Sequence, residues 1–450
     1  MTMKVISPPS RRPTDTQLHR IVIASLAGNA LEWYDFFLYG TAAALIFGPL
    51  FFPVGTDPLT GTLAAFAGFA VGFAARPFGG IVFGHIGDRL GRKTALVLTL
   101  SIMGAATFLI GLLPTYTQIG IWAPILLVLL RIAQGIAAGG EWGGGVLMIS
   151  ENAPPERRGF YSAWSQVGVA GGFVLSAGGF YLVQLLPQEA FMSWGWRIPF
   201  LVSVIIFGLG IYIRAHLPES AEFEEVRKKG ERKHLPVVEA IRRHPREILL
   251  AMGLRVAENG GSYVFLAFAL AYGKFVGVPQ GLMLLGVMVS MTLALATMVM
   301  FGALSDRIGR RPVYLFGAAG LMAAAFPFFW LIDTKLPVLV IFAFMIGNSI
   351  CHAAMIGTQP SFFSELFSPD VRYSGVALGH EIASVFAGGL SPLIATALLA
   401  TYQAAWPVAL YLAFLGGISV VAVLFAREPA PKAKAGALVE IAPLRDRGAG

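Results

Sequence analysis

A short polar motif occurs twice in the chain, about half a chain length apart. Residues 84–93 (GHIGDRLGRK) return as residues 302–311 (GALSDRIGRR), an offset of 218 residues (302 − 84) in a chain of 450. A second pair, 151–158 (ENAPPERR) and 365–372 (ELFSPDVR), follows in the same order with an offset of 214 (365 − 151). Two pairs in one order at nearly one offset predict that the chain contains two copies of one structural unit.

The composition indicates that both copies lie in a membrane. The chain is 56% hydrophobic and 13% charged, whereas a soluble protein has about 25% charged residues. Apolar runs of about 20 residues are long enough to cross the hydrocarbon as helices. We therefore predict an all-α membrane protein with twelve spans in two pseudo-symmetric six-helix bundles, an arrangement typical of transporters. The predicted spans are 20–49, 60–86, 95–113, 121–149, 159–186, 197–215, 248–274, 281–304, 312–332, 337–362, 373–399 and 405–426.

A charged segment divides the chain between the sixth and seventh spans. We predict a disordered N-terminus at 1–19, a first bundle at 20–215, a linker at 216–247, a second bundle at 248–426 and a tail at 427–450. Lysine and arginine gather in alternate loops and in the linker, and the loops on the other side carry little positive charge. The positive-inside rule then places both termini and the linker in the cytoplasm, with the protein spanning the cell (inner or plasma) membrane many times.

Several other function classes are excluded by the residues present. The net charge of +8 comes from short loops between spans, which is the orientation signal of a membrane protein and not a nucleic-acid surface. Cys351 is the single cysteine, so an internal disulfide and a cysteine metal cluster are impossible. The repeated loop lacks the Lys-Ser/Thr of a phosphate-binding loop. No metal-ligand cluster or activated nucleophile is evident, so we expect neither an enzyme nor a bound cofactor.

Charged and polar residues inside three spans are the candidates for function. A charge near the bilayer centre is costly, so it normally faces the bundle interior and marks a pathway. Residues three or four apart share one helical face, and the three groups follow that spacing. The candidates are Asn29, Glu32 and Asp35 in the first span, Arg131, Gln134 and Glu141 in the fourth, and Arg255, Glu258, Asn259 and Tyr263 in the seventh.

These charges have a structural interpretation as well as a functional one. Glu32 with Arg131, or Glu141 with a nearby arginine, could form an ion pair that only fixes helix packing. The acids could instead take and release a proton, since burial disfavours the ionised carboxyl and a neighbouring arginine favours it. His352 and His380 are weaker candidates, and we expect Arg76, which precedes Pro77, to line a kink.

The fifth span contains small residues at a spacing of four. Gly168, Gly172 and Ser176 fall on one helical face, and such a stripe lets two helix backbones approach closely. We predict a tight helix contact along this face.

These motifs together resemble a known family. The repeated loop resembles the signature loop of the major facilitator superfamily, with Ser305 in the second copy where the first has Gly87. Within that superfamily, 29–36 (NALEWYDF), 131–142 (RIAQGIAAGGEW), 218–223 (PESAEF) and 255–259 (RVAEN) resemble the metabolite:proton symporter family. Residues 363–379 are most similar to its shikimate-transporter branch. The loop residues that match are Gly84, Gly87, Asp88, Arg89, Gly91, Arg92, Lys93, Gly302, Asp306, Arg307, Gly309 and Arg310.

The resemblance implies proton-coupled uptake of a small organic anion by alternating access. Its partners would be the anion, the proton and the lipid bilayer, with no nucleic acid, and the proton gradient would supply the driving force to a monomer. The best match is a shikimate-like hydroxylated monocarboxylate. The alternatives are a 2-oxoglutarate, citrate, proline or betaine symporter, a proton-independent facilitator, and a receptor or sensor that kept the transporter fold.

The resemblance also suggests roles for the candidate residues. Asp35, with Glu32 or Glu141, would carry the proton. The forked guanidinium groups of Arg131 and Arg255 would bind the substrate carboxylate, with Arg131 as the main anchor because Glu258 could satisfy Arg255. Hydroxyls would bond to Gln134, Asn259 and Tyr263. Asp88 would help to latch the bundles on the cytoplasmic side, and Asp306 would matter less.

Overall fold

The computed structural model describes residues 15–53, 55, 57–90, 92–139, 149–150, 153–215, 241–368 and 372–427. Helices make up nearly all of this described part, and it contains no strand. Among the predicted site residues, Glu141 and Gly91 lie outside the described residues. The other matched residues of the first loop copy, between Gly84 and Lys93, lie in described helices, but their side chains are outside what is described.

The first half of the chain forms helices that run back and forth along one direction. Short 3₁₀ turns, one π-helical segment and three short helices connect the longer ones. Its elements are α1 (Asp15–Ala42), η1 (Ala43–Phe47), α2 (Gly48–Phe51), α3 (Pro58–Leu90), α4 (Arg92–Leu112), α5 (Tyr116–Ile119), α6 (Trp122–Ala138), η2 (Pro155–Arg157), α8 (Arg158–Val183), α9 (Gln188–Ser193), η3 (Gly195–Arg197) and α10 (Ile198–Ala215).

The second half repeats this pattern with several π-helical segments, which often mark functional sites. Its elements are α13 (Pro245–Arg255), η4 (Val256–Gly260), α14 (Gly261–Tyr263), η5 (Val264–Phe268), α15 (Ala269–Val276), α16 (Gln280–Ile308), α17 (Arg310–Asp333), α18 (Pro337–Phe344), η6 (Met345–His352), α19 (Ala353–Leu366), α20 (Arg372–Ala383), η7 (Ser384–Gly389), α21 (Leu390–Tyr402) and α22 (Trp406–Phe425).

These helices confirm the predicted all-α membrane fold. Within the described residues, nine helices are long and apolar enough to cross a membrane, and Val97–Leu112 and Trp122–Ala138 are shorter apolar helices. The seventh predicted span corresponds to α13–α15, where π-helical segments and charged residues interrupt the apolar pattern. Every predicted span thus overlaps a described helix, and the count of twelve fits the fold.

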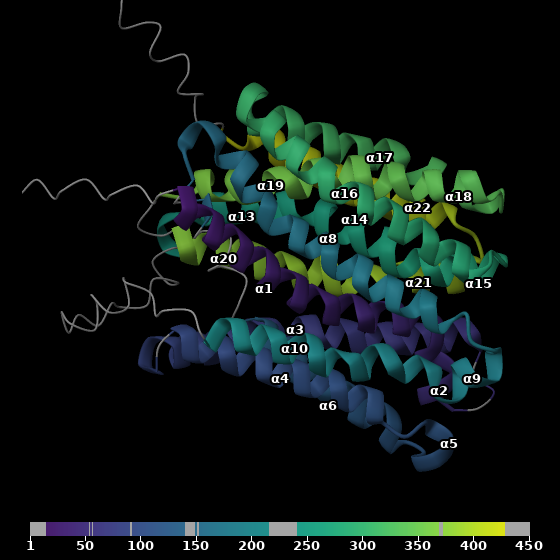
Figure 1. Ribbon diagram of the computed structural model, residues 1–450. Helices are drawn as coiled ribbons and strands as arrows, with labels where there is room; N and C mark the ends of the chain where they lie inside the picture. Colours follow the sequence, from purple (N-terminus) through teal and green to yellow (C-terminus); the bar gives the residue numbers. More distant parts are fainter. Residues whose placement is uncertain are drawn as a thin grey trace, which may run out of the picture.

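The helices lie side by side, with α4 and α6 on one outer face and α17 and α18 on the opposite one (Figure 1). Within the first half, α1 packs on α8 and α3 packs on α6, whereas in the second half α17 packs on α22 and α13 on α20. The halves meet where α8 packs on α16 and where α3 packs on α21. Large apolar side chains such as Ile81, Leu185 and Val338 are exposed on the outside, which a lipid environment favours.

Glycine sets the distance between α1 and α8. A Cβ built on Gly168 would overlap the carbonyl oxygen of Leu26, and one built on Gly172 would lie 2.7 Å from the backbone nitrogen of Tyr34. Ser176, the third small residue of the stripe, is buried. The predicted tight contact along this face is therefore confirmed, and α1 is its partner.

The two halves are joined by polar contacts at one end of the molecule, which we call the basic end because Arg158, Arg307 and Arg310 lie there. The carboxylate of Asp306, at the end of α16, accepts hydrogen bonds from the backbone nitrogens of Gly159 (2.8 Å) and Phe160 (2.9 Å). These nitrogens belong to the first turn of α8, whose N–H groups have no partner within the helix and carry the positive end of its dipole.

Glu365, at the end of α19, adds further contacts between the halves. We call the contacts that Asp306, Glu365 and Arg310 make with the other half, and with one another, the latch. The Glu365 carboxylate pairs with Arg310 of its own half at 3.3 Å and with Arg158 of the other half at 3.7 Å. Arg310 also donates to Asp306 at 2.7 Å. Asp306, which we expected to matter less than Asp88, thus bridges the two bundles through its carboxylate.

We expect Gly172→Ala to destabilise the protein. The added methyl group would meet the backbone of α1, and overpacking of this kind costs roughly 1–3 kcal/mol. Thermal unfolding in detergent should show a lower midpoint. Gly171→Ala is the matched control, since a Cβ there has no heavy atom within 4 Å. Equal midpoints for the two variants would contradict the tight contact.

We expect Asp306→Asn to loosen the latch without unfolding the protein. The amide keeps one acceptor but loses the negative charge that is attracted to the start of α8. If this weakens the contact between the halves by about 1 kcal/mol, the fraction of molecules with the basic end open would rise about fivefold. Labelling of a cysteine introduced at the buried Ser364, in a Cys351→Ser background, would report the opening. Arg307 is an exposed neighbour, so Arg307→Gln should leave labelling unchanged. If Asp306→Asn is labelled like the wild-type protein, the Asp306 carboxylate does not hold the two halves together.

Candidate functional site

A buried polar cluster links three helices of the first half. Gln134 on α6 donates to Asp35 on α1 (Nε2 to Oδ1, 2.7 Å) and to Thr107 on α4 (3.0 Å). Thr107 also donates to Asp35. Arg131, one turn before Gln134, donates to its side-chain oxygen at 3.2 Å. The predicted face of the fourth span therefore meets the predicted acid of the first span.

Aromatic rings surround the guanidinium group of Arg131. Its Cζ atom lies 4.3 Å from the ring centre of Phe36, 4.5 Å from that of Tyr39 and 4.9 Å from that of Phe69. Within the described part of the chain, its Nε and Nη2 atoms have no hydrogen-bond partner. Cation–π attraction stabilises a desolvated guanidinium group, so this charge is held by rings and by the nearby Asp35.

A second cluster lies in the second half, around the π-helical segment η4. Arg255 forms an ion pair with Glu258 and donates to Gln359 at 2.8 Å. The other Glu258 oxygen lies 3.2 Å from Nε2 of His352. The i, i+3 spacing predicted that Arg255 and Glu258 share a face. His352, which the sequence ranked as a weaker candidate, belongs to the same cluster.

Arg76 joins the two halves through two acids. Its Nη2 atom lies 3.6 Å from Glu32 on α1, and its Nε atom lies 3.0 Å from Glu381 on α20. His380 contacts Glu381 at 2.9 Å. The expectation that Arg76 only lines a kink is wrong, because Arg76 forms ion pairs with Glu32 and Glu381. The sequence signal was available, because an arginine inside an apolar span is costly unless it has a partner.

A small central cavity lies between the two halves. Its volume is about 10 Å³, which is roughly the space for one water molecule. Aromatic residues of the first half form one wall, and polar residues of the second half form the other. The lining residues are Trp33, Phe37, Gln166, Val169 and Phe173 on the first side, and Arg255, Glu258, Asn259, Ser262, His352 and Ile356 on the second.

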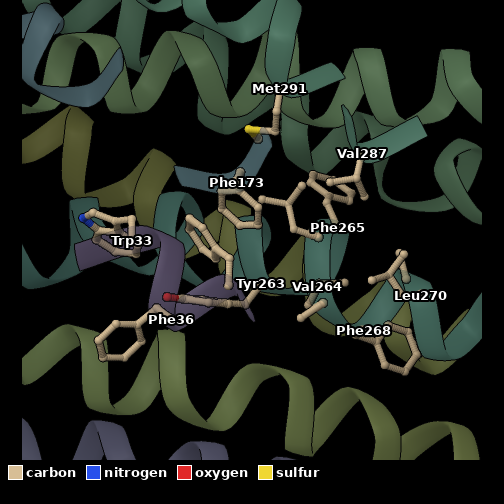
Figure 2. Packing of buried hydrophobic residues seen from close by; sticks show 14 of the residues in the cluster. Trp33, Phe36, Phe173, Tyr263, Val264, Phe265, Phe268, Leu270, Val287 and Met291 are labelled. Carbon is tan, nitrogen blue, oxygen red and sulfur yellow. The ribbon is translucent and has the colours of Figure 1, made fainter. Parts of the chain in front are cut away.

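The aromatic side chains around this cavity come from both halves. Figure 2 shows Trp33, Phe36, Phe173 and Tyr263 converging, with the Tyr263 hydroxyl directed toward Trp33 and Phe36. The ring of Tyr263 packs against those of Phe69 and Phe73, at centre distances of 5.3 and 5.4 Å. Aromatic contacts therefore close the space between the bundles near the middle of the helices.

Several polar atoms at the cavity lack a partner. Among the described residues, Nε1 of Trp33, Oδ1 of Asn259 and Nδ1 of His352 are buried without a hydrogen bond, as is the Tyr263 hydroxyl. A buried polar group without a partner is destabilising, so these atoms form a set of donors and acceptors suited to a solute with hydroxyl groups.

The structure separates the predicted substrate-binding residues into two groups. Arg255, Glu258 and Asn259 line the central cavity. Arg131 and Gln134 belong to the Asp35 cluster and do not line it, and Asn29 donates to the Ser165 backbone (2.8 Å) between helices. The sequence analysis missed the aromatic wall. Its members are Trp33, Phe37 and Phe173.

A wider cleft opens at the end of the molecule opposite the basic end. Gln184, Gln188, Phe191 and Gln280 line it, and its volume is about 300 Å³. Gln184 and Gln280 form a hydrogen bond of 3.1 Å across the two halves. At this end the two glutamines join the halves through neutral side chains, whereas charged groups join them at the basic end.

Comparison with known proteins supports the family resemblance. The family model described as "Major Facilitator Superfamily" matches residues 25–380. The chain is 45% identical over 415 residues to the shikimate transporter of Escherichia coli (strain K12), covering 90% of this chain and 94% of that protein. It is 36% identical over 440 residues to the proline/betaine transporter of the same strain, covering 94% of this chain and 86% of the relative.

Solved structures of low sequence identity share the fold. The xylose transporter XylE from E. coli, in a partially occluded inward open conformation, superposes with a TM-score of 0.71 at 17% identity. The match covers 92% of this chain and 99% of that one. A proton:xylose symporter structure of XylE with a bound sugar gives the same TM-score and identity, covering 92% and 97%.

The named relatives transport solutes and are not enzymes. Together with the membrane-spanning helices, the match over most of the chain identifies a multi-pass membrane protein that transports a solute. It confirms the resemblance drawn from the repeated loop and from the motifs of the first, fourth and seventh spans. The chain belongs to the major facilitator superfamily and is similar to the shikimate transporter within it.

Proposed function

We propose that the protein is a proton-coupled symporter that takes up a small organic anion, a shikimate-like hydroxylated monocarboxylate, by alternating access. The similarity to a shikimate transporter supports this substrate class. The fold shared with a proton:xylose symporter supports coupling to protons. Under the positive-inside rule the basic end faces the cytoplasm, and both termini lie on that side.

The central cavity is the observation that carries the proposal. One wall offers aromatic rings, against which the carbon ring of a small solute can pack. The other wall offers Arg255 for a carboxylate, and Asn259 and His352 for hydroxyls. Ligand sites are commonly apolar with a few placed polar groups, and in transporters of this kind they lie at the midplane between the repeats.

The cavity is too small to hold such a solute in the conformation described here. Its volume of about 10 Å³ and the latch at the basic end indicate an occluded, contracted state. The bundles must separate at one end to admit the solute and at the other end to release it. The cleft lined by Gln184 and Gln280 is the proposed entrance on the outside.

Asp35 is the proposed proton acceptor, held next to Arg131 and away from the cavity wall. Neutralising a buried acid lowers the charge that must move through a low-dielectric barrier. Gln134 contacts both Asp35 and Arg131, so a change of charge on Asp35 alters the position of α6 relative to α1. Glu141 keeps its predicted role as a further acid of the fourth span.

A proline or betaine symporter is the main competing function, and the aromatic wall gives it some support, since rings also bind quaternary ammonium groups. The acid nearest the cavity, however, is Glu258, which is already held by Arg255 and His352. Arg255 is occupied by the same ion pair, so the similarity to a shikimate transporter, and not the lining charges, favours the anion. A dicarboxylate would need a second cationic group, and Arg255 is the one arginine among the described residues that line the cavity.

We expect Asp35→Asn to abolish accumulation against a gradient while retaining exchange. The amide keeps the shape of the side chain but cannot carry the proton. Uptake of labelled shikimate into liposomes, with and without a pH gradient, would be compared with counterflow. Asp333 is an exposed acid at the end of the molecule opposite the basic end, so Asp333→Asn is the control and should still accumulate shikimate. Uphill uptake by Asp35→Asn would show that Asp35 is not the essential proton carrier.

We expect Arg255→Lys to raise the apparent KM for shikimate at least about tenfold, because lysine lacks the fork that binds a carboxylate. Arg246→Lys makes the same change at an exposed position and should leave KM unchanged. Arg131→Lys, at the anchor favoured from the sequence, should change coupling more than KM because Arg131 lies outside the cavity wall.

Unlabelled shikimate should compete with labelled shikimate for uptake better than 2-oxoglutarate does. If betaine is the best competitor, the assignment of an anionic substrate is wrong.

A further inference from the structure

Two of the unpartnered polar atoms belong to residues on opposite walls of the central cavity. Trp33 lines the cavity from α1 of the first half, and His352 lines it from η6 of the second half. Both residues are nearly fully buried, with exposed fractions of 5% and 2%. Among the described residues, Nε1 of Trp33 and Nδ1 of His352 have no hydrogen-bond partner. Buried polar atoms are normally satisfied, so this pair indicates a ligand that supplies the missing partners.

The hydrogen bond on the other ring nitrogen of His352 fixes the role of Nδ1. Nε2 lies 3.2 Å from Oε1 of Glu258, whose other oxygen pairs with Arg255 and accepts from Gln359 at 3.1 Å. A carboxylate in such a pair is ionised and only accepts hydrogen bonds, so the imidazole proton lies on Nε2. A second proton, on Nδ1, would leave a charged N–H group buried without an acceptor, which is costly. Nδ1 is therefore an acceptor that lacks a donor.

The indole of Trp33 has the opposite character. Its nitrogen can only donate a hydrogen bond, and a buried indole N–H group usually finds an acceptor. Figure 2 shows this nitrogen on the side of the indole that faces away from Phe36 and Phe173, so these two rings do not take the place of an acceptor. The first half thus brings a fixed donor to the cavity, and the second half brings a fixed acceptor.

The other unpartnered atoms near the cavity are placed differently. Oδ1 of Asn259 lies against η7, where a Cβ built on Gly388 would overlap it. The hydroxyl of Tyr263 can rotate to donate or to accept, and Tyr263 is not among the described residues that line the cavity. Ser262 lines the cavity, but its hydroxyl donates to the Asn259 backbone at 2.8 Å. The fixed donor and the fixed acceptor are therefore Trp33 and His352.

We propose that one hydroxyl group of the solute bridges the two halves, by donating its proton to Nδ1 of His352 and accepting a hydrogen bond from Nε1 of Trp33. A hydroxyl oxygen both donates and accepts, whereas a ketone oxygen only accepts. The inference rests on the proposed function. It assigns to Trp33 and His352 the selection of a hydroxylated solute over analogues in which that hydroxyl is oxidised or missing.

Such a bridge links solute binding to the closing of the transporter. Trp33 moves with α1 and His352 moves with η6, so one hydroxyl can make both bonds only when the two halves are close together. A ligand shifts an equilibrium toward the state that it binds better, and the right solute therefore favours the closed state. A solute without this hydroxyl leaves a donor and an acceptor buried and unpaired when the halves close, which is the kind of penalty that gives strong discrimination.

Binding of shikimate to the purified protein in detergent, measured by titration calorimetry, tests the bridge. Trp33→Phe keeps an aromatic ring but removes the N–H group. His352→Gln keeps a donor for Glu258 near the position of Nε2 but removes the acceptor at Nδ1. We expect each variant to raise the Kd for shikimate at least about tenfold. Trp330→Phe makes the same change at an exposed position, so it is the matched control and should leave the Kd unchanged.

Analogues of shikimate that each lack one hydroxyl group identify the bridging group. We expect one of these deoxy analogues to bind the wild-type protein at least about tenfold more weakly than shikimate does. Trp33→Phe and His352→Gln should bind that analogue no more weakly than the wild-type protein binds it. The ketone formed by oxidising the same hydroxyl can still accept from Trp33 but cannot donate to His352. Trp33→Phe should therefore weaken binding of the ketone, and His352→Gln should not.

The outcomes distinguish this inference from the proposed function. If the wild-type protein binds no shikimate, the proposed substrate class fails and the bridge fails with it. If the wild-type protein binds shikimate and every deoxy analogue equally well, the bridge alone is wrong. The same holds if Trp33→Phe and His352→Gln prove insensitive to the loss of different hydroxyls. The analogues are measured on the wild-type protein as well, so the test does not depend on how well the two variants fold.

Discussion

The cost of placing charge in the dry centre of a membrane protein controls the rest of this structure. Three arginines lie buried near the middle of the helices, and each is held by acids, amides or aromatic rings. Removing one partner of such a pair leaves an uncompensated charge, which is far more costly than losing a contact near water. The helices must therefore bring these groups together, and the positions of α1, α3, α6, α13 and α20 follow from that requirement.

Small residues make this arrangement possible. Charged side chains can meet only if the helix backbones that carry them approach closely, and glycine removes the obstacle. A Cβ built on Gly135 would overlap the carbonyl oxygen of Gly72, and one built on Gly139 would overlap that of Arg76. The contact between α3 and α6 thus fixes Arg76 relative to Arg131. In this fold the positions of the buried charges therefore depend on how closely the helix backbones pack.

The sequence predicted the fold and part of the site, for physical reasons. The repeat, the apolar runs and the i, i+3 spacing of Arg255 and Glu258 are local patterns, so they can be read without a structure. The pairing of Arg76 with Glu381 joins residues 305 positions apart (381 − 76), and no local pattern contains it. The aromatic wall was missed for another reason. An apolar residue within an apolar span does not differ in polarity from its neighbours. The sequence therefore could not distinguish Phe173 from residues that face the lipid.

The two contacts between the bundles lie at different depths, and each is shared among more than two groups. At the latch, Arg310 contacts both Asp306 and Glu365 of its own half, and Glu365 also contacts Arg158 of the other half. Near the centre, Arg76 contacts Glu32 of its own half and Glu381 of the other. When the bundles separate, Arg310 and Arg76 therefore each keep an acid within their own half, and neither is left as an uncompensated buried charge. A carrier must open and close repeatedly, and partners that stay within one half lower the cost of each opening.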